Sequence, residues 1–207
     1  MIQRSLLGLT LAAALTTVSA RSLAQTTAVK SASIGVMGGL TFPHGSGFTD
    51  LVKRGWNAGA LIRLGVPAFP LSFRIDGQWH QLKGKPIDAG GAGTYTTDLR
   101  IIDGTANFEW TLGKAAASNF YLIGGGGVYG LRERSSFLST NEFLGSSTST
   151  SNATKFGWNA GAGFRFQLTG ISLFVEGRYH SISAGKAFTG SGSHSLHIIP
   201  VTLGIAF

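Results

Sequence analysis

The last stretch of the chain, from Leu196 to Phe207, reads LHIIPVTLGIAF and alternates in character. A period of two predicts a β-strand with one apolar face and one face of mostly small residues. An exposed strand of this kind at the edge of a soluble protein would invite aggregation. A closed barrel in a membrane removes that edge, because the last strand pairs with the first. The oily face comprises Ile199, Val201, Leu203, Ile205 and Phe207.

Segments with the same alternation recur along the whole chain. The expected strands are residues 33–42, 55–66, 71–80, 99–112, 120–129, 157–166, 171–180 and 196–207. Short connections alternate with long ones, which is typical of up-and-down barrels with short turns on one membrane side and long loops on the other. Pro200 has no backbone N–H, so we expect a bulge or a missing bond there. The pattern predicts an all-β, eight-stranded antiparallel transmembrane barrel.

The chain contains an internal repeat. The hexamer GWNAGA occurs at 55–60 and again at 157–162. Residues 171–180 (ISLFVEGRYH) follow 71–80 (LSFRIDGQWH) in character, and LHII at 196–199 follows LRII at 99–102. A shared pattern of glycine-rich strands could imitate duplication, but an identical hexamer followed by two aligned strands favours a true repeat. The barrel is therefore expected to consist of two similar four-strand halves.

The first residues have the features of an export signal. Arg4 precedes an apolar run at 6–15, and small residues at 18–20 (VSA) and 22–24 (SLA) offer cleavage sites. This order is typical of a secretory signal peptide, and the run is shorter than the roughly 20 residues of a spanning helix. We expect residues 1–24 to be the signal, with cleavage after Ala24 or alternatively Ala20. Residues 25–207 then form the barrel domain.

Composition favours the same class of protein. The chain has 31 glycines, no cysteine and only 13% charged residues. An exported protein without disulfides must be held together by its core, a metal or a membrane. No later segment has the apolar length of a transmembrane helix, so strands are the expected membrane-crossing elements.

Aromatic residues are expected in two rows on the outward face. Trp56, Trp79, Trp158 and Tyr179 fall at the loop-side ends of their strands, and Trp110 falls at the opposite end with the terminal phenylalanine. Membrane barrels carry such girdles at both interfaces. The alternative is a soluble, lipocalin-like cup, which would bury its oily residues inside.

Eight charged residues are expected to face the interior of the barrel. An eight-stranded barrel is only just wide enough for its own side chains, and buried charges must be paired and hydrogen-bonded. We therefore expect a filled interior with a balanced charge network, and the alternative is a narrow ion-conducting lumen. The inward charges are Arg63, Arg74, Arg165 and Arg178 with Asp76, Asp103, Glu109 and Glu176.

The signal peptide, the alternating strands and the terminal Phe207 resemble the small outer-membrane β-barrel family, which contains opacity-like, OmpA transmembrane and OmpX-like proteins. The resemblance implies residence in the outer membrane of a Gram-negative cell. The chain's last alternating residues, Val201, Leu203, Ile205 and Phe207, resemble the β-signal that the barrel-assembly machinery reads. The resemblance rests on pattern, so it implies fold and location rather than an activity.

Catalytic, cofactor and metal sites are not expected. Lipid A deacylases of this family use a His-x-Ser pair followed by Glu, whereas residues 180–183 (HSIS) have the wrong spacing and no acid follows Glu176. Histidines 80, 180, 194 and 197 gather near the loop-side rim, but no carboxylate accompanies them in the sequence pattern. The run Gly124–Gly127 lies within a strand and lacks the Lys-Ser/Thr of a phosphate loop. We expect a protein that is not an enzyme.

The loops are basic, which predicts contact with phosphate groups of lipopolysaccharide. The third loop, expected at 135–154, is polar and of low complexity, so we expect it to be mobile and able to contact an external ligand. The favoured hypothesis is a monomeric barrel with a structural or surface-interaction role, and nucleic acid is not an expected partner. The alternatives are a narrow porin-like channel and, less favoured, a lipid A-modifying enzyme. The basic residues are Lys53, Arg54, Lys83, Lys85, Arg132, Arg134 and Lys186.

Overall fold

The computed structural model describes residues 32–45, 48–65, 69–90, 92–112, 118–140, 145–183 and 195–207. The chain divides into two units, Met1–Lys30 and Ser31–Phe207, and all described residues belong to the second. The predicted signal peptide and its cleavage sites lie outside the described residues. Among the described residues, no helix has the length and apolar character needed to span a membrane.

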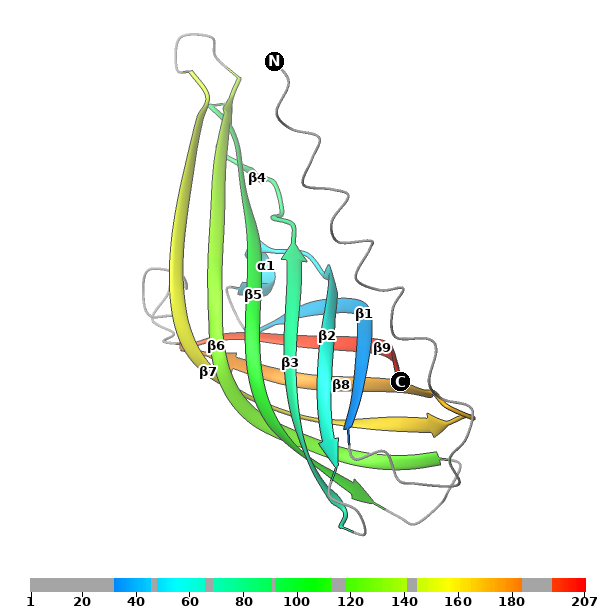
Figure 1. Cartoon of the computed structure of the whole chain (residues 1–207). Helices are drawn as coiled ribbons and strands as arrows, with labels where there is room; N and C mark the ends of the chain where they lie inside the picture. The colour runs from blue at the N-terminus through cyan, green and yellow to red at the C-terminus, as the bar shows by residue number, and fades with distance from the viewer. Residues whose placement is uncertain are drawn as a thin grey trace, which may run out of the picture. The chain divides into compact units, whose positions relative to one another are not determined.

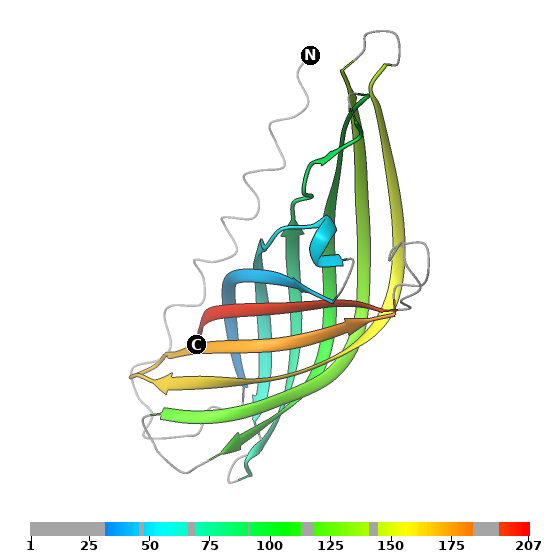
Figure 2. The same cartoon turned by 180° about the vertical axis from the view of Figure 1, so that it is seen from behind.

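The described chain forms a closed antiparallel β-barrel of eight long strands (Figures 1 and 2). Each strand pairs with its sequence neighbour, and β1 also pairs with β9, so the sheet has no open edge within the barrel. The prediction of an eight-stranded up-and-down barrel is confirmed. The long strands are β1 (Ala32–His44), β2 (Gly55–Gly65), β3 (Leu71–Leu82), β5 (Gly93–Leu112), β6 (Ser118–Ser139), β7 (Ser147–Gln167), β8 (Ser172–Ile182) and β9 (Leu196–Ala206). Two short elements, α1 (Phe48–Leu51) and β4 (Ile87–Asp88), lie in the loops.

The stagger of the strands determines the width of the barrel. A path from partner to partner across all eight ladders begins at Ile34 and returns to β1 at His44, ten residues further along. For eight strands this shear corresponds to a tilt of about 40° and a radius of about 8 Å. Such an interior has room for side chains but not for a wide aqueous channel.

The two halves of the barrel pair in the same register. Asn57 faces His80 across β2 and β3, and Asn159 faces His180 across β7 and β8. In the next ladder of each half, His80 faces Ile101 across β3 and β5, and His180 faces Ile198 across β8 and β9. The hexamers GWNAGA thus occupy equivalent places in the two halves, which agrees with the predicted repeat.

Three strands are much longer than predicted. β5, β6 and β7 have 20, 22 and 21 residues, and Figure 1 shows them continuing beyond the ends of the other strands. Ladder pairs run to Phe137↔Ser147, so most of the segment 135–154 is a β-hairpin. The expected loop is therefore strand at 135–139 and 147–154, because backbone pairing between β6 and β7 includes this polar sequence, and residues 141–144 lie outside the described part of the chain. We call residues 93–99, 131–139 and 147–155 the extension.

The ladder between β8 and β9 is interrupted at Pro200. Pairing stops after Gly177↔Val201 and resumes at His180↔Ile198 without a change of register. On the other side, Pro200 still faces Thr41 of β1. The predicted loss of pairing is confirmed, and there is no bulge, because an inserted residue would have shifted the register.

Candidate functional site

The interior of the barrel contains a dense group of buried charged and polar side chains. Its central feature is Glu176, which is 1% exposed. Arg74 donates to Glu176 through Nη1 at 2.7 Å, and the Tyr121 hydroxyl donates to Oε2 at 2.8 Å. Arg178 donates to Oε1 through Nε. One carboxylate therefore holds two guanidinium groups and a phenol, which come from β3, β8 and β6.

A second carboxylate, Glu109, lies nearer the short-turn end of the barrel. Arg63 donates to Glu109 Oε1 at 2.9 Å, and Arg165 Nη2 lies 2.8 Å from both carboxylate oxygens. Arg74 Nη1 is 3.7 Å from Oε2, so it joins this cluster to Glu176. Glu109 is fully buried, whereas the side chain of Arg63 is 21% exposed.

Asp76 connects the remaining parts of the network. Its Oδ1 accepts from Arg74 Nε at 2.7 Å, and its Oδ2 accepts from Asn107 Nδ2 at 2.7 Å and lies 3.1 Å from Arg178 Nη1. Asn107 in turn accepts from Asn159 at 2.8 Å. Seven of the eight charged residues predicted to face inward thus form one network of four arginines and three carboxylates. Buried charges of this kind are tolerated because each has hydrogen-bonded counter-charges.

The eighth predicted charge, Asp103, belongs to a different group. Its Oδ2 is 2.9 Å from His80 Nε2, and His80 Nδ1 is 2.8 Å from the Thr41 hydroxyl. All three side chains are buried. The order hydroxyl, imidazole and carboxylate is that of a catalytic triad. Thr41 is 0% exposed, however, so a substrate has no access to this hydroxyl in the described structure.

The histidine of the second half, His180, has other partners. Its Nδ1 is 2.9 Å from the Tyr129 hydroxyl, and its ring centroid is 6.2 Å from that of His80. The two histidines thus meet inside the barrel, each two residues from the loop-side end of its strand. Of the four histidines that the sequence pattern places near the rim, His194 lies outside the described residues. Within the described residues, no cluster of three or more metal-ligating side chains is present.

Apolar side chains close the loop-side end of the interior. Phe48 and Leu51 of α1 pack against a buried cluster that includes Val52 (Figure 2 shows α1 at this end). The Lys85 backbone N–H donates to the Leu51 carbonyl at 2.7 Å, so the second loop holds the first in place. The other buried members of the cluster are Leu82, Leu99, Ile101, Tyr129, Leu131, Ile182, Leu196 and Ile198.

Two large side chains fill the interior by lying against glycines. A Cβ added at Gly163 would lie 2.3 Å from the Tyr121 ring, and one at Gly204 would lie 2.2 Å from the Phe174 ring. Glycine at these positions therefore makes room for an aromatic ring from the neighbouring strand. These rings share the interior with the polar network and the apolar cluster under α1.

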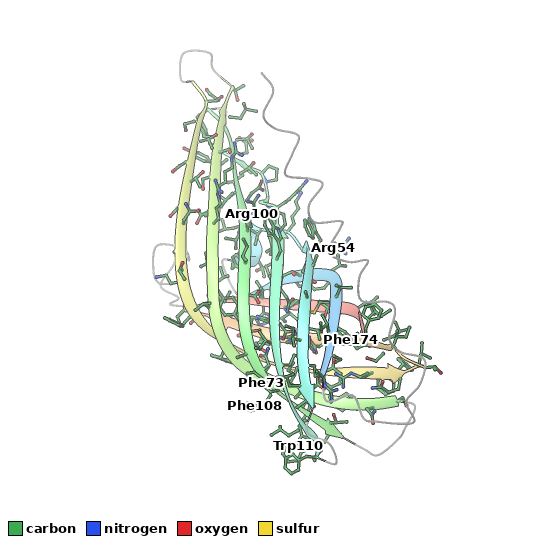
Figure 3. The ribbon with its side chains drawn as sticks, viewed as in Figure 1. Arg54, Phe73, Arg100, Phe108, Trp110 and Phe174 are labelled. Atoms are coloured by element: carbon green, nitrogen blue, oxygen red, sulfur yellow. The ribbon has the colours of Figure 1, made fainter. Side chains whose placement is uncertain are left out.

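The outward face has the opposite character. Trp56, Trp110 and Trp158 are each about half exposed, and Figure 3 shows Trp110 at the end of β5 that faces the short turns. Tyr179 contacts Trp158, with ring centroids 5.6 Å apart, and stacks on His197 at 5.3 Å. Between the rows the exposed side chains are apolar, among them Ile34, Val36, Ile62, Ile75, Ile102, Phe108, Leu122, Val175 and Leu203. This arrangement is that of a barrel whose outside contacts lipid.

The residues of the predicted β-signal share this outward face. Val201, Leu203 and Phe207 are exposed, and Ile205 is partly buried. Phe207 also completes the barrel through its backbone, because its N–H donates to the Ile34 carbonyl at 2.8 Å.

Several interior groups are not among the residues predicted from the sequence. Thr41, His80, Tyr121 and Tyr129 contribute hydrogen bonds to the interior, whereas the predicted network consists of charged residues. The alternation of each strand contains the missing signal, since Tyr121 and Tyr129 are an even number of residues apart on β6 and share the inward face. Of the predicted basic loop residues, Lys53, Arg54, Lys83, Arg132 and Arg134 are exposed, Lys85 is partly buried, and Lys186 lies outside the described residues.

No protein-family model matches the sequence, and no curated protein sequence matches it either. Solved structures do match the fold. A major outer membrane protein from Thermus thermophilus is 13% identical with a TM-score of 0.57, over 85% of this chain and 98% of that one. Neisserial surface protein A (NspA) is 14% identical with a TM-score of 0.52, over 85% and 96% of the two chains. The chain therefore has the fold of the small outer-membrane β-barrels, and the predicted resemblance is confirmed at that level.

Proposed function

We propose that the protein is an integral outer-membrane barrel with a structural or surface-interaction role and without a conducting pore. The observation that carries this proposal is the reversal of polarity between the two faces. Arginines and carboxylates fill the inside, and leucine, isoleucine and aromatic side chains cover the outside between two aromatic rows. In water this outer face would be a very large exposed apolar surface, whereas in a bilayer it is matched to lipid.

The filled interior favours a closed barrel over a narrow channel. The arginines at mid-barrel, Arg74 and Arg178, are 1% and 2% exposed, so their charges are in contact with protein rather than with solvent. The apolar cluster under α1 closes the path towards the loops. An ion would have to displace both layers to cross.

The same burial argues against catalysis. Thr41, His80 and Asp103 have the order of a nucleophile, base and orienting acid, but a lipid or peptide substrate cannot reach the hydroxyl without opening the barrel. The hydrogen bonds among these three side chains explain their burial without a catalytic role.

The extension is the element that we propose for surface interaction. It places serine and threonine residues of β7 beyond the barrel, and among the described residues no strand pairs with the outer edge of β7 before Gly157. The side chains along residues 147–152 are all exposed. An exposed polar edge can add a strand from a partner or contact surface polysaccharide, and its polarity protects it from aggregation.

Three measurements test the proposal. Purified protein in lipid vesicles should shift in gel mobility on heating, and protease added outside intact cells should cut the hairpin near Gly145. In planar bilayers the protein should show no steady conductance. A steady conductance that changes on replacement of Glu109 or Arg165 would instead support the channel, and absence of the heat shift would contradict a membrane barrel.

Mass spectrometry of lipid A, with and without expression of the protein, tests the enzymatic alternative. We expect identical lipid A in both cells. A change in acylation or phosphate content that depends on His80 would contradict the proposed lack of activity.

A further inference from the structure

A hollow of about 360 Å³ lies on the outer face of the sheet at the junction between the barrel wall and the extension, where β5, β6 and β7 leave the barrel. Arg100 and Arg132 line it with Asn152 and Thr154, and Ile102 lies on its barrel side. Figure 3 shows Arg100 near this departure point, at the other end of the barrel from Trp110. The hollow is separate from the interior network, because its exposed side chains belong to the outward set of each strand.

The two arginines are direct neighbours across the sheet. Arg100 faces Arg132 in the β5–β6 ladder, and Arg132 faces Asn152 in the β6–β7 ladder. Like charges directly opposite each other destabilise a sheet. Among the described residues, no carboxylate forms an ion pair with either arginine, so the structure brings two cations together without a protein counter-charge.

One of the two guanidinium groups is held in position. The Arg100 Cζ lies 4.6 Å from the centroid of the Trp79 ring, and its Nε donates to Gln81 Oε1 at 3.3 Å. Trp79 belongs to the loop-side aromatic row. Trp79 and Gln81 both belong to β3, so these contacts hold the Arg100 guanidinium on the β3 side of the hollow. This restraint lowers the entropy that the side chain loses when it binds a ligand.

The position of the hollow relative to the aromatic row indicates what occupies it. Arg100 faces Gln81, two residues beyond Trp79 on β3. With the strand tilt given above, the two arginines lie about 5 to 10 Å beyond the aromatic row. Aromatic girdles lie at headgroup level, so the guanidinium groups are at the height of the lipid phosphates in the leaflet on the loop side.

A glycine creates the space. Gly130 lies between Ile102 and Thr154 in the ladders and contributes no side chain to the outer surface. A Cβ added there would make only an ordinary contact, 3.6 Å from the Ile102 carbonyl oxygen. The glycine is thus not required by close backbone packing, and a larger side chain would occupy the hollow without displacing a neighbour.

We propose that this hollow binds a phosphate group of lipopolysaccharide from the side, through Arg100 and Arg132. The inference rests on the proposed residence in the outer membrane, and it assigns the lipid contact to the junction between the barrel wall and the extension. Arginine pairs bind phosphate through charge-assisted, bidentate hydrogen bonds, and Asn152 and Thr154 supply further polar groups. Ile102 and the apolar wall next to it contact the acyl chains of the same lipid.

The test compares lipid binding by native mass spectrometry of the full chain folded in detergent. The probes are diphosphoryl lipid A, its dephosphorylated form, and inorganic phosphate as a competitor. The double variant Arg100→Gln/Arg132→Gln and the single variant Gly130→Leu should each weaken binding of diphosphoryl lipid A about tenfold or more. Dephosphorylated lipid A should bind all variants equally weakly.

The matched control is Arg134→Gln. Arg134 is the next outward-facing arginine on β6, but it faces Asp98 across the ladder and does not line the hollow. The substitution removes the same charge from the same strand, and binding should change less than about twofold. Heat-modifiable gel mobility of every variant verifies that the barrel has folded.

The outcomes separate the two proposals. If the parent protein folds and inserts but binds lipid A without dependence on its phosphates or on Arg100 and Arg132, the site is refuted and the barrel is not. If inorganic phosphate competes as well as the lipid does, the site takes free anions and the lipid assignment is refuted. If the parent does not insert into membranes, the proposed function fails, and the lipid site fails with it.

Discussion

Replacing Glu176 by glutamine should strongly destabilise the barrel. The substitution keeps the size of the side chain but removes the negative charge that Arg74, Arg178 and Tyr121 share. Both arginines are almost completely buried, so they lose a counter-charge that water cannot replace. Breaking a buried ion pair by removing one partner costs about 3–5 kcal/mol. With a urea dependence of about 2 kcal/mol per M, the unfolding midpoint should fall by about 2 M.

The assay is urea unfolding in lipid vesicles, followed by tryptophan fluorescence and by heat-modifiable gel mobility. Glu133→Gln is the matched control, because Glu133 lies on the extension and accepts a hydrogen bond from the Ser135 hydroxyl at 3.2 Å. Its midpoint should be unchanged. Adding Arg178→Met to Glu176→Gln should restore part of the lost stability, because it removes one orphaned charge. Equal midpoints for Glu176→Gln and Glu133→Gln would refute the argument that the interior network holds the barrel together.

Two further substitutions test the packing of the interior and the closure of the barrel. Gly204→Ala would place a Cβ 2.2 Å from the Phe174 ring, so the urea midpoint should fall by an amount equivalent to about 1–3 kcal/mol. Gly177→Ala, whose Cβ would meet nothing within 4 Å, is the control and should have no such effect; a similar loss in both would contradict the close packing. Deletion of Phe207 removes the outward aromatic and its backbone bonds to β1, so less protein should reach the outer membrane in cell fractionation. Ser147→Ala, at an exposed position at the start of β7, should assemble normally, and equal membrane levels of the two variants would count against an assembly signal at the C-terminus.

Alternation allowed the barrel and its inward charges to be predicted, because the period of two assigns each side chain to a face independently of its partners. Strand ends were less predictable. The segment at 147–154 (STSTSNAT) has no oily face, so its composition indicated a loop, whereas pairing with β6 makes it a strand. A strand that leaves the membrane no longer needs apolar residues, and the pattern that reveals the barrel disappears there.

The partners of the interior charges could not be predicted, because they depend on the register between strands. Asp103 was expected to join the balanced network with the arginines, and it pairs with His80 instead. The hollow at Arg100 was missed for a related reason. Arg100 and Arg132 are far apart in sequence, and only the β5–β6 register makes them neighbours. From the sequence, Arg132 is expected in a loop, and Arg100 is not among the expected basic loop residues.

The two halves share one register but carry different side chains at some matching interior positions. Through the shared register, Arg74 corresponds to Phe174, and the Arg74 guanidinium lies 5.4 Å from the centroid of that ring. Arginine at both positions would set two guanidinium groups against each other near the barrel axis. Phenylalanine at one position replaces that repulsion with a cation–π contact.

The same comparison accounts for Pro200. It occupies the place in the second half that Asp103 occupies in the first. His180 therefore lacks a carboxylate at the position where His80 has one, and it bonds to Tyr129 instead. A second aspartate would add another negative charge to an interior about 8 Å in radius, where every charge needs its own partners. A duplicated barrel of this width must diverge in its interior in order to fill it, so we expect Pro200→Asp to lower the urea midpoint even though it restores the symmetry of the repeat.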